Sequence, residues 1–237
     1  MERRTLCSHP GRDMYDVLTS LHTHLHPKRY MEIGTWNGRS LSLASCASLA
    51  VDPHFNLVGN VVAQKPLCAF YQTTSDAFFQ SHDPAQILGG LIDFAFLDGL
   101  HLFEALLRDF INTERSCRTN SVVALHDCIP PQLSWTARTP TPGEYWMGDV
   151  WKVPLVLRKY RPDLKIYALD SPPSGLILIT NLDPGSSALS SRYYDILAEF
   201  RDLDLAALEP AVLAGMFQTM STDLFETADQ LSQYFWL

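Results

Sequence analysis

The sequence has few cysteines, few charged residues and no long apolar run. Its cysteines are odd in number and form no Cys-x-x-Cys pair; they are Cys7, Cys46, Cys68, Cys117 and Cys128. Neither a disulfide framework nor a zinc knuckle is therefore indicated, and free thiols in a reducing compartment are the simplest explanation. Charged residues make up only 19% and hydrophobic residues 46% of the 237 residues, which argues against a wholly disordered chain.

The longest apolar runs are far shorter than the roughly 20 residues that a membrane-spanning helix needs. No apolar segment of signal-peptide length follows the charged start Met1-Glu2-Arg3-Arg4. The formal net charge is -8, so the chain lacks a general positive field that would attract nucleic acid or an anionic membrane. We therefore expect a cytoplasmic protein that binds neither nucleic acid nor a membrane.

Short apolar segments alternate with segments of helical pattern along most of the chain. We predict strands over 30–34, 49–51, 67–71, 91–98 and 121–125, and an antiparallel hairpin over 165–169 and 175–181. Helices are predicted near 14–26, 38–47, 75–79, 102–117, 149–161 and within 189–237. This order indicates an α/β fold, a Rossmann-like three-layer sandwich with a mostly parallel seven-stranded sheet and an antiparallel edge hairpin. We expect one domain over 1–189 with an N-terminal helical arm, and a C-terminal helical extension over 190–237 that packs on the domain or on a partner subunit.

The loop after the first predicted strand contains Gly34 and Gly38. Glycine permits a positive φ and a close approach of the backbone to a ligand, and the free N–H groups at the start of the helix predicted over 38–47 can bind an anion. An ordinary strand-to-helix turn explains the two glycines equally well.

Acids follow four successive predicted strands: Asp52, Asp76, Asp98 and Asp127. The fourth and fifth strands also deliver His101 and His126 to the same edge of the sheet, where ligands of open α/β sheets bind. Simpler roles stay open. Asp52 can order a turn before Pro53, Ser75 or Asp76 can cap a helix, His101 can cap the helix after it, and His126 can be a neutral core residue.

Residues 129–147 contain four prolines and the aromatic residues Trp135, Tyr145 and Trp146. The segment is too polar and too broken for a core element, and a loop of this length inside a compact domain is disordered or functional. We predict a covering loop with an aromatic wall, and an oligomer contact is the alternative.

Several of these segments together resemble a known family. Glu32-Ile33-Gly34-Thr35-x-x-Gly38-x-Ser40, Asp52, Phe96-Leu97-Asp98-Gly99-x-His101 and His126-Asp127 are similar to the motifs of class I S-adenosylmethionine-dependent methyltransferases. The resemblance extends over 28–182 and is to the small-molecule O-methyltransferases grouped with cephalosporin-hydroxylase-like and macrolide-sugar methyltransferases. It implies S-adenosyl-L-methionine as cofactor, bound by Glu32, Gly34, Thr35, Gly38, Ser40, Asp52, Ser75, Asp76 and Asp98. The first four residues would line the methionine portion, Asp52 the ribose hydroxyls, and Ser75 with Asp76 the adenine.

The same resemblance implies the chemistry. His101 would be the general base, with Asp98 and His126 beside it in the catalytic site, and Asp98, Asp127 and His126 would bind a metal ion. His126 departs from the metal-dependent relatives, which often carry an acid at that position. Because magnesium prefers oxygen ligands, this departure leaves open magnesium, manganese, another divalent ion or no metal at all.

The resemblance thus implies O-methylation of a hydroxyl group on a small molecule or a sugar-containing natural product. A cofactor-binding or interaction protein without catalysis is the main alternative. An NAD-type oxidoreductase is disfavoured because the loop is Gly-x-x-x-Gly instead of Gly-x-Gly-x-x-Gly. An iron oxygenase is disfavoured by the strand-helix alternation. A homo-oligomer is compatible with the long C-terminal segment.

Overall fold

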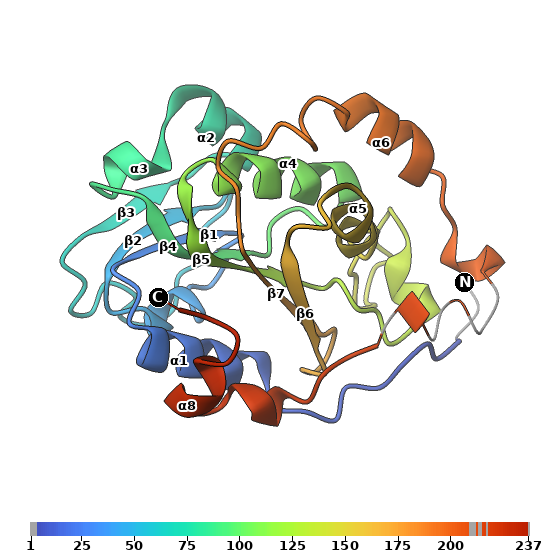
Figure 1. Ribbon diagram of the computed structural model, residues 1–237, viewed down its shortest axis with the longest axis horizontal. Helices are drawn as coiled ribbons and strands as arrows, with labels where there is room; N and C mark the ends of the chain where they lie inside the picture. The colour runs from blue at the N-terminus through green and yellow to red at the C-terminus, as the bar shows by residue number, and fades with distance from the viewer. Residues whose placement is uncertain (1–3, 209–211, 213–214, 217, 237) are drawn as a thin grey trace.

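A computed structural model describes residues 4–208, 212, 215–216 and 218–236. Its centre is one seven-stranded sheet (Figure 1). The strands are β1 (Arg29–Ile33), β2 (Ala47–Val51), β3 (Cys68–Tyr71), β4 (Ile92–Leu97), β5 (Cys117–His126), β6 (Lys165–Leu169) and β7 (Leu176–Thr180). Their order is β3-β2-β1-β4-β5-β7-β6; β1 to β5 are parallel, and β7 is antiparallel to both of its neighbours. The predicted Rossmann-like fold with an antiparallel hairpin is confirmed.

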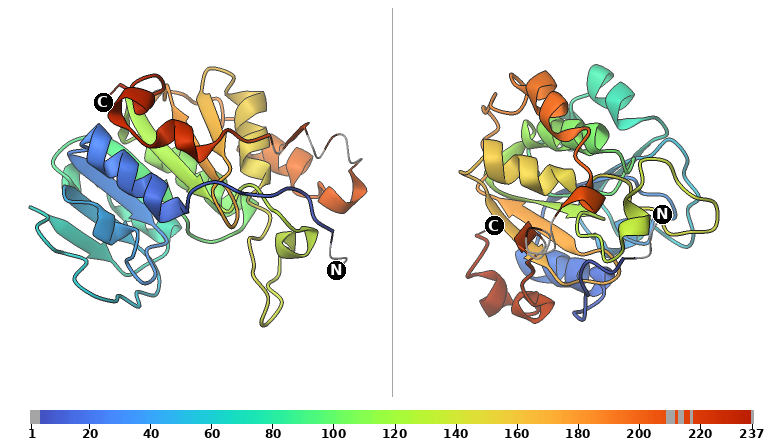
Figure 2. Two further views of the ribbon diagram at one scale, coloured as in Figure 1. Left: turned by 90° about the horizontal axis from the view of Figure 1, so that it is seen from below. Right: turned by 90° about the vertical axis from the view of Figure 1, so that its right-hand side faces the viewer.

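Helices cover both faces of the sheet, which makes three layers (Figures 1 and 2). One face packs against α2 (Ser75–Ser81), α3 (Pro84–Ile87), α4 (Phe103–Glu114), α5 (Lys152–Tyr160) and α6 (Tyr193–Phe200). The other face packs against α1 (Met14–Leu25), η4 (Thr222–Phe225) and α8 (Ala228–Leu231). The central strands β1 and β4 are buried by helices on both sides, which explains why β4 is nearly all apolar.

The predicted helix over 38–47 is wrong. Only the 3-10 turn η1 (Leu41–Leu43) forms there, and Ala47 already begins β2. The segment is rich in serine, a weak helix former whose side chain competes for backbone partners. Ser42 does so here, because its hydroxyl donates to the Arg39 carbonyl at 2.7 Å. The sequence predicted an anion site at the N-terminus of this helix. Because the helix does not form, that site is absent from residues 38–47.

Two further details differ from the sequence predictions. The residue that caps α2 is Thr74, whose hydroxyl accepts from the Ala77 amide, and neither Ser75 nor Asp76 has that role. The segment predicted to be helical over 189–237 contains only short helices among its described residues: α6, η3 (Leu205–Ala207), η4 and α8. Parts of that prediction fall on residues 209–211, 213–214, 217 and 237, which lie outside the described residues.

The described part of the C-terminal extension contacts both outer layers. Ile196 and Phe200 of α6 join the core on the α4 side, while Phe225 and Leu231 join the core on the α1 side. The boundary at residue 189 itself stays a prediction. In the described residues no helix combines the length and the apolar character that crossing a bilayer requires.

Candidate active site

Two acids and two histidines meet at the carboxyl ends of β4 and β5. Asp98 directly follows β4, His126 is the last residue of β5, and Asp127 comes next. His101 lies three residues after Asp98, just before α4. Because β4 and β5 are parallel neighbours with Leu97 opposite Leu125, their ends lie side by side, and we call these four residues the acid–histidine cluster.

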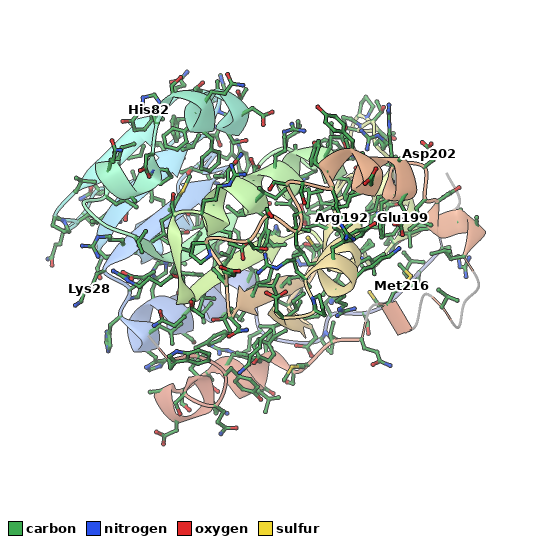
Figure 3. The ribbon with its side chains drawn as sticks, turned by 45° about the horizontal axis from the view of Figure 1, so that its top comes forward. Lys28, His82, Arg192, Glu199, Asp202 and Met216 are labelled. Carbon is green, nitrogen blue, oxygen red and sulfur yellow. The ribbon has the colours of Figure 1, made fainter. Side chains whose placement is uncertain are left out.

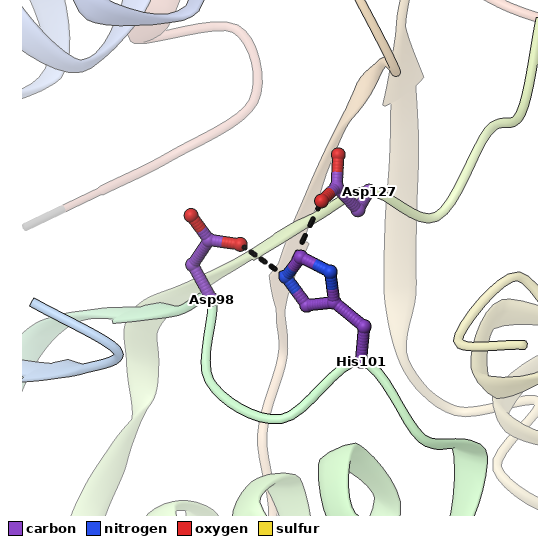
Figure 4. A group of neighbouring side chains, drawn as sticks. All are labelled: Asp98, His101 and Asp127. Carbon is purple, nitrogen blue, oxygen red and sulfur yellow. Dashed lines mark hydrogen bonds and ion pairs between the residues drawn. The ribbon is translucent and has the colours of Figure 1, made fainter. Parts of the chain in front are cut away.

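Each histidine of the cluster faces both acids. His101 Nε2 lies 3.3 Å from Asp98 Oδ1 and 3.3 Å from Asp127 Oδ2, so that the ring stands between the two carboxylates (Figure 4). His126 Nδ1 lies 3.3 Å from Asp98 Oδ1 and 3.4 Å from Asp127 Oδ1. The side chains of His126 and Asp127 are almost fully buried, whereas those of His101 and Asp98 are 22% and 23% exposed. A reactant can therefore reach the cluster from the His101–Asp98 side.

The charges of the cluster alter its pKa values strongly. Burial by itself would lower the pKa of His101, but the hydrogen bond to Asp98 and the charge of Asp127 raise it to about 9. For His126 the order is the same: burial would lower the pKa, and the charges of Asp98 and Asp127 raise it to about 9. Burial would raise the pKa of Asp98, yet the two histidines hold it below its ordinary value. Near neutral pH and without a bound cation, both imidazole rings are therefore positively charged, with a proton on each nitrogen. His101 can act as a base only after one of these protons has left.

The loop 129–147, which we call the covering loop, lies against this cluster. His101 Nδ1 donates to the Trp146 carbonyl at 2.9 Å, and the Trp146 ring is 5.3 Å from the His101 ring. The Tyr145 hydroxyl donates to Asp127 Oδ1 at 3.4 Å, and Trp135 packs on Tyr145 with ring centres 4.7 Å apart. All three aromatic residues of the loop thus form a wall beside the cluster, two by direct contact and Trp135 through Tyr145.

The glycine loop after β1 touches the cluster through the backbone. Gly34 has φ +85°, and a Cβ atom there would lie 1.9 Å from the Asp98 carbonyl oxygen. Only glycine permits this close approach, which brings the end of β1 against the end of β4. On β1 itself, Glu32 is fully buried and accepts from the Tyr30 hydroxyl at 2.6 Å. Burial raises the pKa of Glu32 to about 7.

Two buried oxygens in this region, Glu32 Oε1 and Thr35 Oγ1, make no hydrogen bond of regular geometry within the described chain, although Thr35 and Ser40 lie near enough to Glu32 to offset part of the rise in its pKa. Buried polar atoms without a partner are costly, so each such atom requires an explanation such as a ligand or a water molecule. Both lie at the carboxyl end of β1, the edge of the sheet at which Asp98 also lies. The end of β1 therefore presents unused oxygens beside the acid–histidine cluster.

Comparison with known proteins agrees with this geometry. Residues 31–128, from β1 to just past β5, match the model of a family described as "Methyltransferase domain". These residues are therefore similar in sequence to a methyltransferase domain. The resemblance to class I methyltransferases is thereby confirmed at the level of the fold and the domain family. No curated protein matches the chain in sequence.

Solved structures support the fold of the methyltransferase domain. An O-methyltransferase from Bacillus cereus in complex with SAH superposes with a TM-score of 0.53 at 12% identity, over 73% of this chain and 83% of that chain. The O-methyltransferase TomG from Streptomyces achromogenes, involved in tomaymycin synthesis and solved in complex with SAM, gives 0.51 at 14% identity, over 70% and 78% of the two chains. At such low identity these structures show a shared fold and leave the substrate undetermined.

The other predicted cofactor residues of the methyltransferase domain lie on the loops after β1, β2 and β3. Asp52 is buried, and its oxygens accept from the Trp36 and His54 amides, each at 2.7 Å. Asp76 forms a two-pronged ion pair with Arg108, with both distances 2.7 Å. Ser75 begins α2, Ser40 is buried just before η1, and Gly38 packs against Val61. Among the described contacts, Asp52 and Asp76 each have a structural role, although a carboxylate oxygen that accepts one hydrogen bond can accept another.

The cluster contains three side chains of the types that bind metal ions in proteins. Asp98, His101 and Asp127 each offer one atom, and these atoms lie within 4.8 Å of one another. The predicted set contained His126 in place of His101. In the structure His126 faces the same two carboxylates with Nδ1, while its Nε2 is 3.2 Å from the Ser174 hydroxyl. Two carboxylates and an imidazole suit manganese or a similar ion better than magnesium, which prefers oxygen alone.

A hollow of about 970 Å³ lies elsewhere, where the amino ends of β1 and β5 meet α1 and α8. Among its lining residues, Asp93 pairs with Arg118 and accepts from the backbone amides of Lys28 and Arg29. Size alone does not make an active site, and the three-residue group of metal-ligand type found among the described residues lies in the acid–histidine cluster, away from this hollow. We therefore take the acid–histidine cluster as the candidate active site.

Proposed function

We propose that this methyltransferase domain transfers a methyl group from S-adenosyl-L-methionine to a hydroxyl group of a small molecule or a sugar-containing natural product. The observation that carries the proposal is the acid–histidine cluster beside the glycine loop of β1. The cluster supplies groups that can take a proton from a hydroxyl, at the sheet edge where open α/β folds bind their ligands. The O-methyltransferases with SAM or SAH bound that share the fold support the same cofactor.

The residues at the end of β1 fit the methionine portion of this cofactor. Its ammonium group is a donor that needs acceptors, and Glu32 Oε1 and Thr35 Oγ1 are buried acceptors without a partner. Gly34, with its positive φ, lets this loop lie directly against the Asp98 backbone, so that the end of β1 and the acid–histidine cluster border one site. We assign the ribose to Asp52 and the adenine to Ser75 and Asp76 as part of the same proposal.

An NAD-type oxidoreductase fits the structure less well. Dinucleotide sites hold the pyrophosphate at the N-terminus of the helix after the first strand. Here that connection contains only the 3-10 turn η1. S-adenosyl-L-methionine has no phosphate and does not need that helix.

Methyl transfer from S-adenosyl-L-methionine requires few functional groups from the protein. A sulfonium methyl group is already activated, so the chain must align the acceptor oxygen with it and remove the hydroxyl proton. The Trp146 carbonyl accepts from Nδ1 of His101, which leaves Nε2 as the nitrogen that takes the proton. That nitrogen points between Asp98 and Asp127, so the acceptor hydroxyl binds at this place.

Asp98 and Asp127, with His126, would hold a divalent cation, which leaves Nε2 of His101 free to take the proton. When bound, such an ion polarises the acceptor hydroxyl and cancels part of the carboxylate charge. The contacts with Asp98 and Asp127 raise the pKa of His101 to about 9. A cation held by these carboxylates would offset their negative charge and lower the pKa of His101 toward neutral pH, where the imidazole can act as a base.

Transfer of a labelled methyl group tests this function. The chain is incubated with methyl-labelled S-adenosyl-L-methionine, manganese or magnesium, and a panel of catechols, flavonols and glycosides; matched amines and thiols are the controls. We expect label in at least one hydroxyl acceptor and none in the controls. If the cofactor binds but label reaches no acceptor in the panel, a cofactor-binding protein without catalysis is favoured. Label in an amine or thiol acceptor would contradict O-methylation.

A further inference from the structure

Arg138 joins the covering loop to the start of α4. The loop projects from the body of the molecule (Figure 2), and its outermost residues, 139–145, are exposed. Arg138 lies just before these residues and donates to both carboxylate oxygens of Glu104, at 2.6 and 3.1 Å. It also donates to Asp149 Oδ2 at 2.5 Å. Two-pronged arginine–carboxylate pairs fix both distance and orientation, so this contact sets the position of the loop.

Both partners of Arg138 are tied to the segment that carries His101. Glu104 is in the first turn of α4, three residues after His101. Asp149 Oδ1 accepts from the Phe103 amide at 2.8 Å, and this contact supplies the cap that the side chain of Leu102 does not provide. Arg138 therefore links the covering loop to the same short stretch from which His101 projects.

Hydrogen bonds also join the two arms of the covering loop to each other. Trp146 Nε1 donates to the Ala137 carbonyl at 2.6 Å, and the Met147 amide donates to the Trp135 carbonyl at 2.9 Å. At Gly148 a Cβ atom would lie 1.7 Å from the His101 carbonyl oxygen, so the returning arm of the loop touches the His101 backbone. The two arms are therefore joined to each other, and these contacts connect Arg138 to Tyr145 and Trp146.

We propose that Arg138 is a positioning residue for the methyl transfer proposed above. By fixing the covering loop, it keeps the Trp146 carbonyl on His101 Nδ1 and the Tyr145 hydroxyl on Asp127. The inference rests on the proposed function for its effect on turnover, whereas its structural part stands on the loop contacts alone.

The fold does not depend on Arg138, which makes the proposal testable. Without it, Asp149 keeps Lys152, whose Nζ donates to Asp149 Oδ2 at 3.0 Å, as well as the Phe103 amide. Glu104 is 27% exposed and can be solvated. Arg138→Met therefore leaves no buried charge unpaired.

Hydrogen exchange and steady-state kinetics on the full chain test the proposal together. For Arg138→Met we expect amide exchange within 135–147 to rise at least about tenfold and kcat to fall roughly 10- to 100-fold, because small misplacements of positioned groups cost that much. KM for S-adenosyl-L-methionine should stay within about twofold, since its proposed residues lie outside the loop. Arg138→Lys should recover part of both losses, which a purely structural lesion would not produce.

Arg118→Met is the matched control. It removes an arginine that pairs with Asp93 at the amino ends of the strands, and Asp93 keeps the Lys28 and Arg29 amides. This variant should behave like the wild type in both measurements. Unchanged loop exchange in Arg138→Met overturns the anchor, and raised exchange with unchanged kcat overturns the positioning role. If the wild type transfers no methyl group at all, the proposed function fails, while exchange still decides whether Arg138 holds the loop.

Discussion

Replacing His101 by alanine is expected to lower kcat for methyl transfer about 10²- to 10⁴-fold, the range that general base catalysis contributes. Of the two histidine side chains of the cluster, that of His101 is 22% exposed and that of His126 only 7%, so His101 is the one that an acceptor hydroxyl can reach. The affinity for S-adenosyl-L-methionine should change less than about twofold, because its proposed binding residues lie on other loops. Initial rates measure the loss of kcat, and calorimetric titration with S-adenosyl-L-methionine measures the affinity for the cofactor.

His101→Ala also removes the contact with Trp146, so a second variant separates base from anchor. His101→Gln keeps an amide N–H that can donate to the Trp146 carbonyl, but it has no basic nitrogen. Turnover near the wild-type level in His101→Gln would show that His101 only holds the covering loop. His24→Ala, on α1 and away from the cluster, should leave turnover unchanged.

Removing the divalent cation is the second change for which we expect a large effect. A chelator should abolish methyl transfer by the wild-type chain, and manganese should restore it, because in the proposed mechanism Asp98 and Asp127 would bind an ion that polarises the acceptor hydroxyl. Asp98→Asn keeps the shape of the side chain and removes its charge. We expect manganese affinity to fall at least about 100-fold, since even the outer partners of metal ligands are worth 10- to 100-fold. Calorimetric titration with manganese measures this loss.

Asp202→Asn is the control for that variant, because Asp202 is exposed and lies beyond α6 (Figure 3). It should bind manganese as the wild type does. Full activity in the presence of the chelator would remove the metal from the mechanism and leave His101 as the remaining catalytic group of the proposal. Circular dichroism of Asp98→Asn separates a lost ligand from a lost fold.

The strands could be predicted from the sequence because each is a short apolar run that ends in a polar residue. In β4, five of the six side chains are buried, so the run is almost uninterrupted, and Asp98 marks its end. Once β4 and β5 are parallel neighbours, Asp98 and Asp127 must lie at one edge. The meeting of these acids was therefore predictable from topology alone.

The absence of a helix over 38–47 was not predictable, because tertiary contacts override a weak local preference. Gly38 has φ +78°, and a Cβ there would lie 2.5 Å from Val61. The backbone of 37–38 is instead held by a neighbouring loop, since the Val58 amide donates to the Asn37 carbonyl. A single sequence gives no signal for such a contact across the intervening β2 strand.

The contacts that hold His101 were equally invisible in the sequence. Its partner Trp146 is 45 residues away in the chain, and Arg138 is 34 residues away from Glu104. Both lie on an irregular loop, whose path no periodic pattern describes. The aromatic residues of the loop gave the only signal. They indicated an aromatic wall, but they did not indicate that it contacts His101 or that Arg138 holds it in place.

Binding of S-adenosyl-L-methionine, compared with NAD⁺, tests the central claim most directly. At about 100 times the dissociation constant, a ligand that binds only the folded chain adds about 2.7 kcal/mol of stability, which is roughly 5 to 10 °C in the unfolding midpoint of a chain of this size. We expect this rise with S-adenosyl-L-methionine and no rise with NAD⁺. A rise with NAD⁺ and none with S-adenosyl-L-methionine would contradict the assignment of the β1 loop and of the methyltransferase function together.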